Sequence, residues 1–280
     1  MSTPSVTRLV FTDLDGTLLD HYNYSYADAM PRLRALERMG IPVIPVTSKT
    51  RAEIEQLRAE LRNRHPFVVE NGAAVFIPEG YFPQAPAETR LYDGYWVREF
   101  APPRSRWLEL LESMDEVYSG EFSSFFRLGT RGIMELTGLP EARARQANQR
   151  EYSEPVHWIG RESRRQRFQA DLEAAGATVL QGGRFLAVSG NTDKGRALRW
   201  LRACFSGPVQ DLAAGDSGND CAMLEAAATA LLVRSPAHAF PALRRVDGVI
   251  QSRAFGPAGW AEGVSRWLDH SAVAGENQEQ

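Results

Sequence analysis

Hydrophobic positions follow two different periods along the first third of the chain. Arg8–Phe11 and Ile41–Val46 are short apolar runs, as expected of parallel strands that are buried on both faces. Apolar residues within 29–39 recur at helical spacing, after a capping-box-like start at Ser25–Asp28. A second capping box, Thr50–Glu53, opens another predicted helix. This alternation predicts right-handed βαβ units and a doubly wound, mostly parallel α/β sheet.

The same alternation returns near the end of the chain. Strands are predicted at 209–214 and 230–233, with a short edge piece at 249–250. Helices are expected around these strands, at 191–205, 218–228 and 257–268. Just before the middle segment, two further strands are expected, at 67–69 and 73–77.

The middle of the chain has a different pattern. Three prolines and a glycine within Pro78–Pro86 predict a hinge. Mixed α+β elements follow, which indicates an inserted cap at 83–189 and a core domain made of 1–82 and 190–280. The elements predicted for the cap are strands at 92–100, 155–159, 178–181 and 184–188 (the last two joined through Gly182-Gly183) and helices at 105–116, 140–150 and 162–175.

Composition and charge narrow the class of partner. The chain has 280 residues, of which 43% are hydrophobic and 24% charged, as is ordinary for a globular protein. A net charge of −3 provides no basic field for nucleic acid or membrane, so a small-molecule partner is expected. Two unpaired cysteines, a short polar start and no apolar run near ~20 residues predict a soluble cytoplasmic protein. The oligomeric state is left open.

The most informative polar cluster follows the first strand, within Phe11–Thr17. Asp13 and Asp15 fall on the loop where open α/β sheets place their chemistry, beyond the carboxyl ends of the strands. Residues two apart in extended chain point the same way, so both carboxylates can face one crevice. Such a pair offers hard oxygen ligands for Mg²⁺ and supplies a nucleophile beside an acid or base. An ordinary polar turn is the plainer alternative.

Three further polar signals accompany later elements. Thr47 closes the second apolar strand, before a helix N-terminus whose N–H groups suit phosphate oxygens. Lys194 begins a helix, where its charge opposes the helix dipole, as is expected at functional positions. Gly215–Asp220 follows another strand and carries three acid or amide side chains. Helix capping and surface solvation are the alternatives for these residues. The five histidines form no close pair and are expected to be non-catalytic.

These four signals, in this order, resemble the haloacid dehalogenase-like phosphatases. The resemblance implies that Asp13 is a nucleophile that forms an aspartyl-phosphate, and that Asp15 is the general acid and base. It implies Mg²⁺ held by Asp13, the Asp15 carbonyl and Asp216. Residues expected to bind the phosphoryl group or to support the metal site are Thr47, Lys194, Asn219 and Asp220.

Within that superfamily the chain resembles the mannosyl-3-phosphoglycerate phosphatases. The similar segments are Thr47–Thr50, Glu70–Ala73 with Pro78–Phe82, Gln149–Pro155 and Gly182–Phe185. The resemblance implies a cap with a small antiparallel sheet and a substrate that carries a carboxylate, a phosphate and sugar hydroxyls. The residues expected to contact this substrate are Ser48, Lys49, Glu70, Asn71, Arg150, Tyr152, Ser153 and Arg184.

One departure leaves the sugar open. Related enzymes often carry an aromatic residue and a histidine after the Gly-Gly-Arg-Phe motif, whereas Leu186-Ala187-Val188 follow here. Glucosyl-3-phosphoglycerate or another sugar phosphate is therefore an alternative substrate. A phosphomutase and a non-catalytic binding protein are more remote alternatives, and no aspartate or lysine of the core motifs is missing.

Overall fold

The computed structural model describes residues 6–181 and 184–276, so the predicted Gly182-Gly183 junction lies outside the described residues. Its contacts divide the chain into two compact units. The first unit comprises Met1–Thr47, Arg64–Val97 and Asp193–Gln280, and the second comprises Ser48–Asn63 and Arg98–Thr192. The division predicted from the sequence, with a cap at 83–189, stays a prediction.

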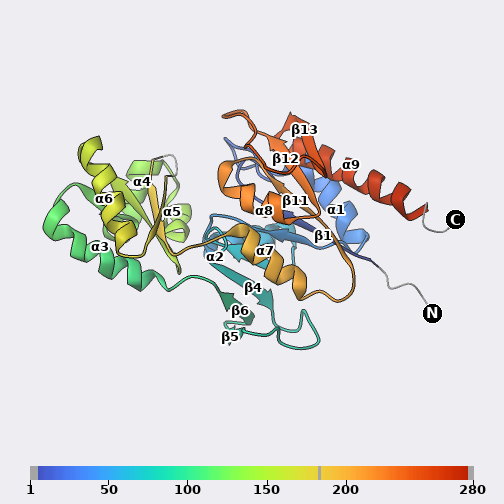
Figure 1. Ribbon diagram of the computed structural model, residues 1–280, viewed down its shortest axis with the longest axis horizontal. Coiled ribbons are helices and arrows are strands. Elements are labelled where there is room, and N and C mark those ends of the chain that lie inside the picture. The colour runs from blue at the N-terminus through green and yellow to red at the C-terminus, as the bar shows by residue number, and fades with distance from the viewer. Residues whose placement is uncertain (1–5, 182–183, 277–280) are drawn as a thin grey trace. The chain divides into compact units, whose positions relative to one another are not determined.

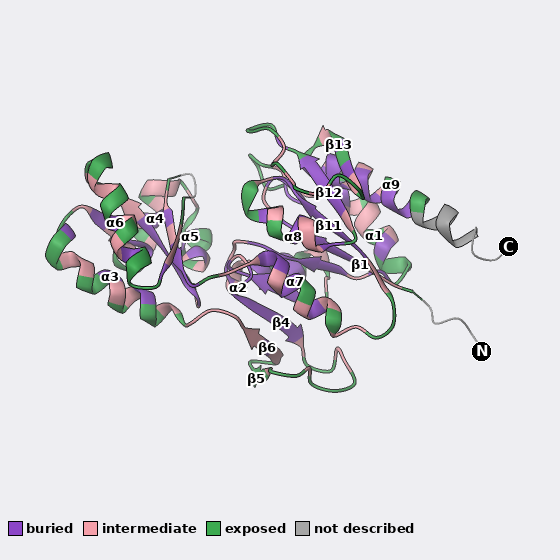
Figure 2. Ribbon diagram, in the orientation of Figure 1, coloured by how far each residue is buried: buried purple, intermediate pink, exposed green. Residues whose placement is uncertain are grey.

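A five-stranded parallel sheet forms the centre of the first unit, in the order β13-β12-β11-β1-β2 (Figure 1). Strand β1 pairs in parallel with β11 from Thr7↔Val209 to Thr12↔Ala214, and with β2 on its other side. Figure 2 shows that the inner strands β12, β11 and β1 are largely buried, as their apolar sequences predict. The strands are β1 (Thr7–Thr12), β2 (Val43–Pro45), β11 (Val209–Gly215), β12 (Thr229–Arg234) and β13 (Val249–Phe255). The predicted doubly wound α/β fold is confirmed.

Helices cover this sheet, and a second sheet completes the unit. Helices α1 (Met30–Arg38) and α9 (Gly256–Glu276) contact each other, as do α7 (Lys194–Ala203) and α8 (Cys221–Ala226). Figure 1 shows α8 on one side of β11 and β12, with α1 and α9 on the other. The second sheet has the order β3-β4-β6-β5, and an isolated bridge between Val46 and Val68 connects it to the region after β2. Its strands are β3 (Phe67–Val69), β4 (Ala74–Pro78), β5 (Arg90–Tyr92) and β6 (Tyr95–Glu99).

The second unit contains a four-stranded antiparallel sheet in the order β7-β8-β10-β9. Trp107, Tyr118 and Phe168 are fully buried in its core. A small antiparallel sheet of this kind is what the resemblance implied for the cap. The elements are α2 (Arg51–Leu61), α3 (Arg104–Tyr118), β7 (Phe122–Ser124), α4 (Phe125–Thr137), α5 (Glu141–Asn148), β8 (Ser153–Trp158), α6 (Glu162–Ala174), β9 (Thr178–Gln181) and β10 (Leu186–Ser189).

Several local predictions can be compared with the structure. The Thr50–Glu53 capping box is confirmed, because each residue's backbone N–H donates to the other's side chain. The Ser25–Asp28 box is wrong: the Ser25 hydroxyl accepts from the Ala27 N–H, and a 3₁₀ turn, η1 (Ala27–Ala29), precedes α1. The helix predicted at 218–228 begins as a 3₁₀ turn, η2 (Gly218–Asp220), and α8 follows.

Four elements were not predicted from the sequence or were predicted too short. Strand β7 and helix α4 were not predicted, and Gly129 interrupts α4 with a φ of 60°. Strand β13 has seven residues where a two-residue edge piece was expected, and α9 continues through Glu276. Among the described helices, none combines the length and the apolar character that a bilayer-spanning segment requires.

Candidate active site

The loop after β1 is a tight turn that directs Asp13 to the edge of the sheet. The Asp13 N–H donates to the Ala214 carbonyl of β11 at 2.8 Å, so the residue continues the ladder of the parallel sheet. The chain then folds back, with Gly16 N–H donating to the Leu19 carbonyl at 2.9 Å. Gly16 has a φ of 82°, and a Cβ there would lie 2.5 Å from Asp216 Oδ2. A glycine therefore lets the loops after β1 and β11 approach each other.

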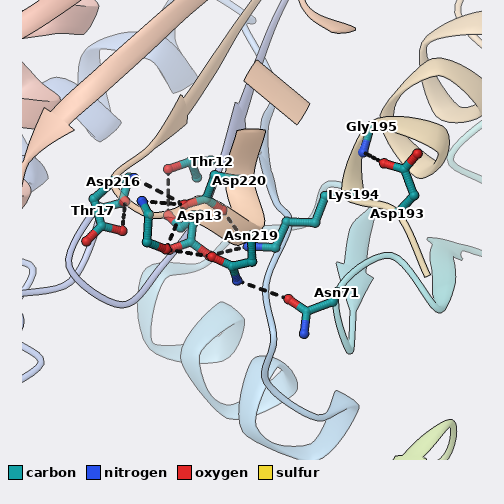
Figure 3. A network of polar contacts seen from close by, with 11 residues as sticks. Thr12, Asp13, Thr17, Asn71, Asp193, Lys194, Gly195, Asp216, Asn219 and Asp220 are labelled. Carbon is teal, nitrogen blue, oxygen red and sulfur yellow. Dashed lines mark hydrogen bonds and ion pairs between the residues drawn. The ribbon is translucent and has the colours of Figure 1, made fainter. Parts of the chain in front are cut away.

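Lys194 is buried against two carboxylates (Figure 3). Its Nζ donates to Asp13 Oδ1 at 2.7 Å and to Asp220 Oδ1 at 2.6 Å. The lysine begins α7, whose N-cap residue Asp193 accepts a hydrogen bond from the Gly195 N–H at 2.7 Å. Since the side chain of Lys194 is 0% exposed, the alternative of a solvated surface lysine is excluded.

The loop after β11 is held by both oxygens of Asp220. While Oδ1 accepts from Lys194, Oδ2 accepts from the backbone N–H groups of Asp216 and Ser217, each at 3.1 Å. The Asp216 carboxylate in turn accepts a hydrogen bond from the Thr17 hydroxyl at 3.2 Å. Asp220 thus makes the contacts that a residue orienting Asp216 and Lys194 would make.

Three of these carboxylates are placed suitably for a divalent cation. Asp13, Asp216 and Asp220 are buried, and one oxygen of each lies within 4.8 Å of the others. Buried carboxylate oxygens are hard ligands of the kind that Mg²⁺ prefers. Both oxygens of Asp220 already accept hydrogen bonds, from Lys194 and from backbone N–H groups. The predicted metal ligands, Asp13, the Asp15 carbonyl and Asp216, stay a prediction. Asp15 is half-buried on the same loop.

Burial and the charges of neighbouring carboxylates raise the pKa values of Asp13 and Asp216. Burial raises the pKa of Asp13 to about 8; Asp220 and Asp15 add to this increase, and Lys194 opposes it. Burial and Asp220 also raise the pKa of Asp216. Burial alone would lower the pKa of Lys194, but Asp13 and Asp220 outweigh it, and the net direction is upward. The site is therefore short of positive charge, and a bound cation would favour ionised Asp13.

Thr47 lies at the end of the next strand, beside a turn at Glu70–Gly72. Thr47 is buried, its N–H donates to the Val68 carbonyl at 3.1 Å, and its carbonyl accepts from the Asn71 N–H at 2.9 Å. The side chain of Glu70 is also buried. Figure 3 shows that the Asn71 side chain contacts the loop after β11, where its Oδ1 accepts from Asn219 Nδ2 at 3.1 Å.

His238 is a residue of the site that the sequence reading missed. Its Nε2 lies 3.4 Å from Asp216 Oδ2, and its Nδ1 lies 3.0 Å from the Ala239 carbonyl. No motif marks this histidine. It does follow β12, the neighbour of β11, so the rule that chemistry gathers beyond the carboxyl ends of parallel strands could have drawn attention to it.

The other residues predicted to bind substrate belong to the second unit, and several contact one another there. Arg150 Nη1 donates to Ser153 Oγ at 3.0 Å and to the Ser48 carbonyl at 3.2 Å. Tyr152 is buried, and its hydroxyl donates to Glu99 Oε1 at 2.9 Å. Arg150, Ser153 and Ser48 thus form one polar cluster, whereas Tyr152 lies in the interior.

Lys49 and Arg184 make different contacts. Lys49 Nζ lies 3.9 Å from Glu53 Oε1, one helical turn further on. Arg184 is exposed, and its Nη1 donates to the Leu136 carbonyl at 2.5 Å, near the C-terminal end of α4. Arg150 and Arg184 therefore contact separate parts of the second unit.

The chain is similar to known proteins in sequence and in fold. Residues 10–84 match the haloacid dehalogenase-like hydrolase family, and residues 160–268 match the sucrose-6F-phosphate phosphohydrolase family. A solved phosphatase of the haloalkanoate enzyme superfamily from Bacteroides thetaiotaomicron superposes with a TM-score of 0.64 at 18% identity, over 96% of each chain. At that identity the superposition shows the fold alone.

Two curated relatives are similar in sequence over most of the chain. The glucosyl-3-phosphoglycerate/mannosyl-3-phosphoglycerate phosphatase of Methanococcoides burtonii is 35% identical over 260 residues, which is 92% of this chain and 96% of that protein. The mannosyl-3-phosphoglycerate phosphatase of Pyrococcus horikoshii is 35% identical over 233 residues, which is 82% of this chain and 92% of that protein. This chain is therefore a phosphoric monoester hydrolase and belongs to the haloacid dehalogenase-like phosphatases, in the family of the mannosyl-3-phosphoglycerate phosphatases.

Proposed function

We propose that the protein is a Mg²⁺-dependent phosphatase that hydrolyses mannosyl-3-phosphoglycerate, or its glucosyl counterpart, to the sugar-glycerate and phosphate. The observation that carries the proposed chemistry is the buried Lys194, held between Asp13 and Asp220 at 2.7 and 2.6 Å. A buried ammonium beside a strand-end carboxylate suits a nucleophile that must approach a phosphate dianion. The proposed substrate rests on sequence similarity to phosphatases of glucosyl- and mannosyl-3-phosphoglycerate.

In the proposed reaction Asp13 is the nucleophile and Asp15 is the general acid and base. A carboxylate oxygen of Asp13 forms a bond to phosphorus while the bond from phosphorus to the leaving oxygen breaks, and Asp15 donates its proton to that oxygen. Water then attacks the aspartyl-phosphate as Asp15 takes up the water's proton. Asp13 is regenerated and inorganic phosphate is released. Lys194 and Thr47 are the groups proposed to bind the phosphoryl oxygens.

Asp13, the Asp15 carbonyl and Asp216 would hold the proposed Mg²⁺. When bound, a divalent cation supplies charge neutralisation for the phosphoryl group. The raised pKa of Asp13 supports this proposal, because a nucleophile that is protonated near neutral pH would be inactive unless additional positive charge favoured its ionised form.

Recognition of the sugar-glycerate is proposed for the second unit. The Arg150, Ser153 and Ser48 cluster supports it, because a guanidinium can exchange a neutral carbonyl partner for a substrate carboxylate. Lys49 and the exposed Arg184 offer further positive charge, and Tyr152 stays a predicted substrate contact. Glu70, in the first unit, also stays a predicted substrate contact. The cytoplasmic location also stays a prediction.

A substrate screen with phosphate detection tests the proposal. The purified protein would be assayed with mannosyl- and glucosyl-3-phosphoglycerate, 3-phosphoglycerate, sucrose 6-phosphate and glucose 6-phosphate, each with Mg²⁺ and with excess EDTA. We expect Mg²⁺-dependent phosphate release, fastest from one of the two glycosyl-phosphoglycerates. Equal rates on all five esters would contradict the substrate class. Full activity in EDTA would contradict the metal requirement.

A further inference from the structure

Three consecutive residues of the first unit adopt left-handed backbone geometry. Glu70, Asn71 and Gly72 have φ values of 48°, 59° and 91°. This geometry is unfavourable for residues with a side chain, although asparagine tolerates it better than most. A run of this kind persists only where the surroundings fix it, and such runs cluster at functional sites.

The turn is fixed on two sides by parts of the active site. On one side Thr47 accepts the Asn71 N–H at 2.9 Å. On the other, Gly72 lies against the backbone that leads into Lys194, since a Cβ at Gly72 would be 2.5 Å from the Asp193 carbonyl oxygen and 2.8 Å from the Lys194 nitrogen. The turn therefore lies directly against the start of α7.

A chain of side-chain hydrogen bonds connects Asn71 to the charged groups (Figure 3). Asn71 Oδ1 accepts from Asn219 Nδ2 at 3.1 Å, and Asn219 Oδ1 accepts from the Ser217 hydroxyl at 2.5 Å. The Ser217 N–H donates to Asp220, whose other oxygen accepts from Lys194. Asn71 is thus one end of a polar chain that terminates at the lysine.

We infer that Asn71 is a positioning residue for the reaction, and that it acts through Asn219 on the loop after β11 instead of through a sugar hydroxyl. The side-chain oxygen of Asn71 accepts a hydrogen bond from Asn219, and the residue holds a left-handed backbone conformation. The bond joins residues 148 positions apart, so it ties the end of the second sheet to the loop that carries Asp216 and Asp220. This inference rests on the proposed roles of Lys194, Asp216 and Asp220.

A double-mutant cycle with two substrates tests the inference. Asn71→Gly removes the side chain but keeps the left-handed backbone accessible, and Asn219→Ala removes the partner from an exposed position. Each single variant should lower kcat about two- to tenfold, the size expected for one neutral hydrogen bond. The loss should be the same on nitrophenyl phosphate and on the glycosyl-phosphoglycerate, with KM for the latter unchanged. The double variant should be no slower than the slower single variant.

Two controls keep the result interpretable. Asp93 has a φ of 50° in the exposed turn between β5 and β6, so Asp93→Gly makes the same backbone change outside the active site. It should leave kcat and KM unchanged. Thermal unfolding should give a second readout that does not depend on turnover. The loss of stability in the double variant should be smaller than the sum of the losses in the Asn71 and Asn219 single variants.

Three results would overturn the inference. A raised KM for the sugar substrate alone would make Asn71 a substrate-binding residue. Losses that multiply in the double variant would show that Asn71 and Asn219 act separately. Unchanged kcat in Asn219→Ala would sink it even if Asn71→Gly failed to fold. Failure of the proposed function would give a different result, because Asp13→Asn would then keep its full activity.

Discussion

Binding of Mg²⁺ should tighten with pH because of Asp13. In the metal-free protein burial raises the pKa of Asp13 to about 8, from an ordinary value of 3.8. A cation needs the ionised carboxylate, so between about pH 6 and pH 7 each bound cation should displace close to one proton from Asp13, and about half a proton at about pH 8. The apparent Kd should then fall about tenfold for each pH unit and level off above about pH 8, since one pKa unit corresponds to about 1.4 kcal/mol.

The stability of the metal-free protein should fall as the pH rises, whereas its affinity for Mg²⁺ should increase. The pKa of Asp13 is higher in the folded than in the unfolded chain, so the folded protein binds more protons between about pH 4 and pH 8. The contribution of Asp13 to stability is fully present below about pH 4 and is lost as the pH rises through about 8. Added Mg²⁺ should offset that loss, by an amount that grows with pH.

Two measurements check this linkage. Melting temperatures with and without Mg²⁺ at about pH 6, 7 and 8, with ionic strength held constant by KCl, should show an increment that grows with pH. Titration calorimetry at about pH 7 in two buffers of different ionisation enthalpy should count close to one proton released for each cation. An increment independent of pH, or no proton release, would show that Asp13 is already ionised without metal, and the reasoning from burial would fail.

Three mutations test other parts of the site. Asp13→Asn should abolish turnover and leave the circular dichroism spectrum unchanged; retention of a tenth of the wild-type rate would disprove the nucleophile assignment. Gly16→Ala places a Cβ 2.5 Å from Asp216 Oδ2 at a φ of 82°, so it should cost about 2 kcal/mol of stability and weaken Mg²⁺ binding; unchanged melting temperature and Mg²⁺ affinity would refute this. Arg184→Ala should leave hydrolysis of nitrophenyl phosphate near the wild-type rate and lower kcat/KM on the glycosyl-phosphoglycerate about ten- to a hundredfold. Equal losses on both substrates would contradict it, and Arg131→Ala, which removes another exposed arginine of the second unit, is the matched control.

The charged centre of the site could be predicted from the sequence because each part leaves a local signal. Asp13, Thr47 and Asp216 each follow an apolar run that reads as a parallel strand. Parallel strands of one sheet end at the same edge, so these residues were expected to meet there. Lys194 was visible because its charge is unfavourable at a helix start. The cluster of Asp13, Lys194, Asp216 and Asp220 agrees with that expectation.

The remaining contacts depend on tertiary structure and leave no local signal. The bond between Asn71 and Asn219 follows from how two loops meet, and His238 lies in an unpatterned loop. Helix α4 was missed because Gly129 interrupts its pattern, a glycine with non-helical dihedral angles. The contacts of Arg184 with the end of α4 could not be foreseen without that helix.

The pairing of β1 with β11 has a consequence for how the protein is made. Strand β1 leads directly into Asp13, yet the strand that pairs with β1 along its whole length, Val209–Ala214, lies some two hundred residues further along the chain. Until that segment has been translated, one edge of β1 has no strand to pair with, and a nascent apolar edge is prone to association with other chains. The cluster joins Asp13, which is translated early, to Lys194 and Asp220, which are translated late, so we expect activity to appear only after synthesis has passed Asp220.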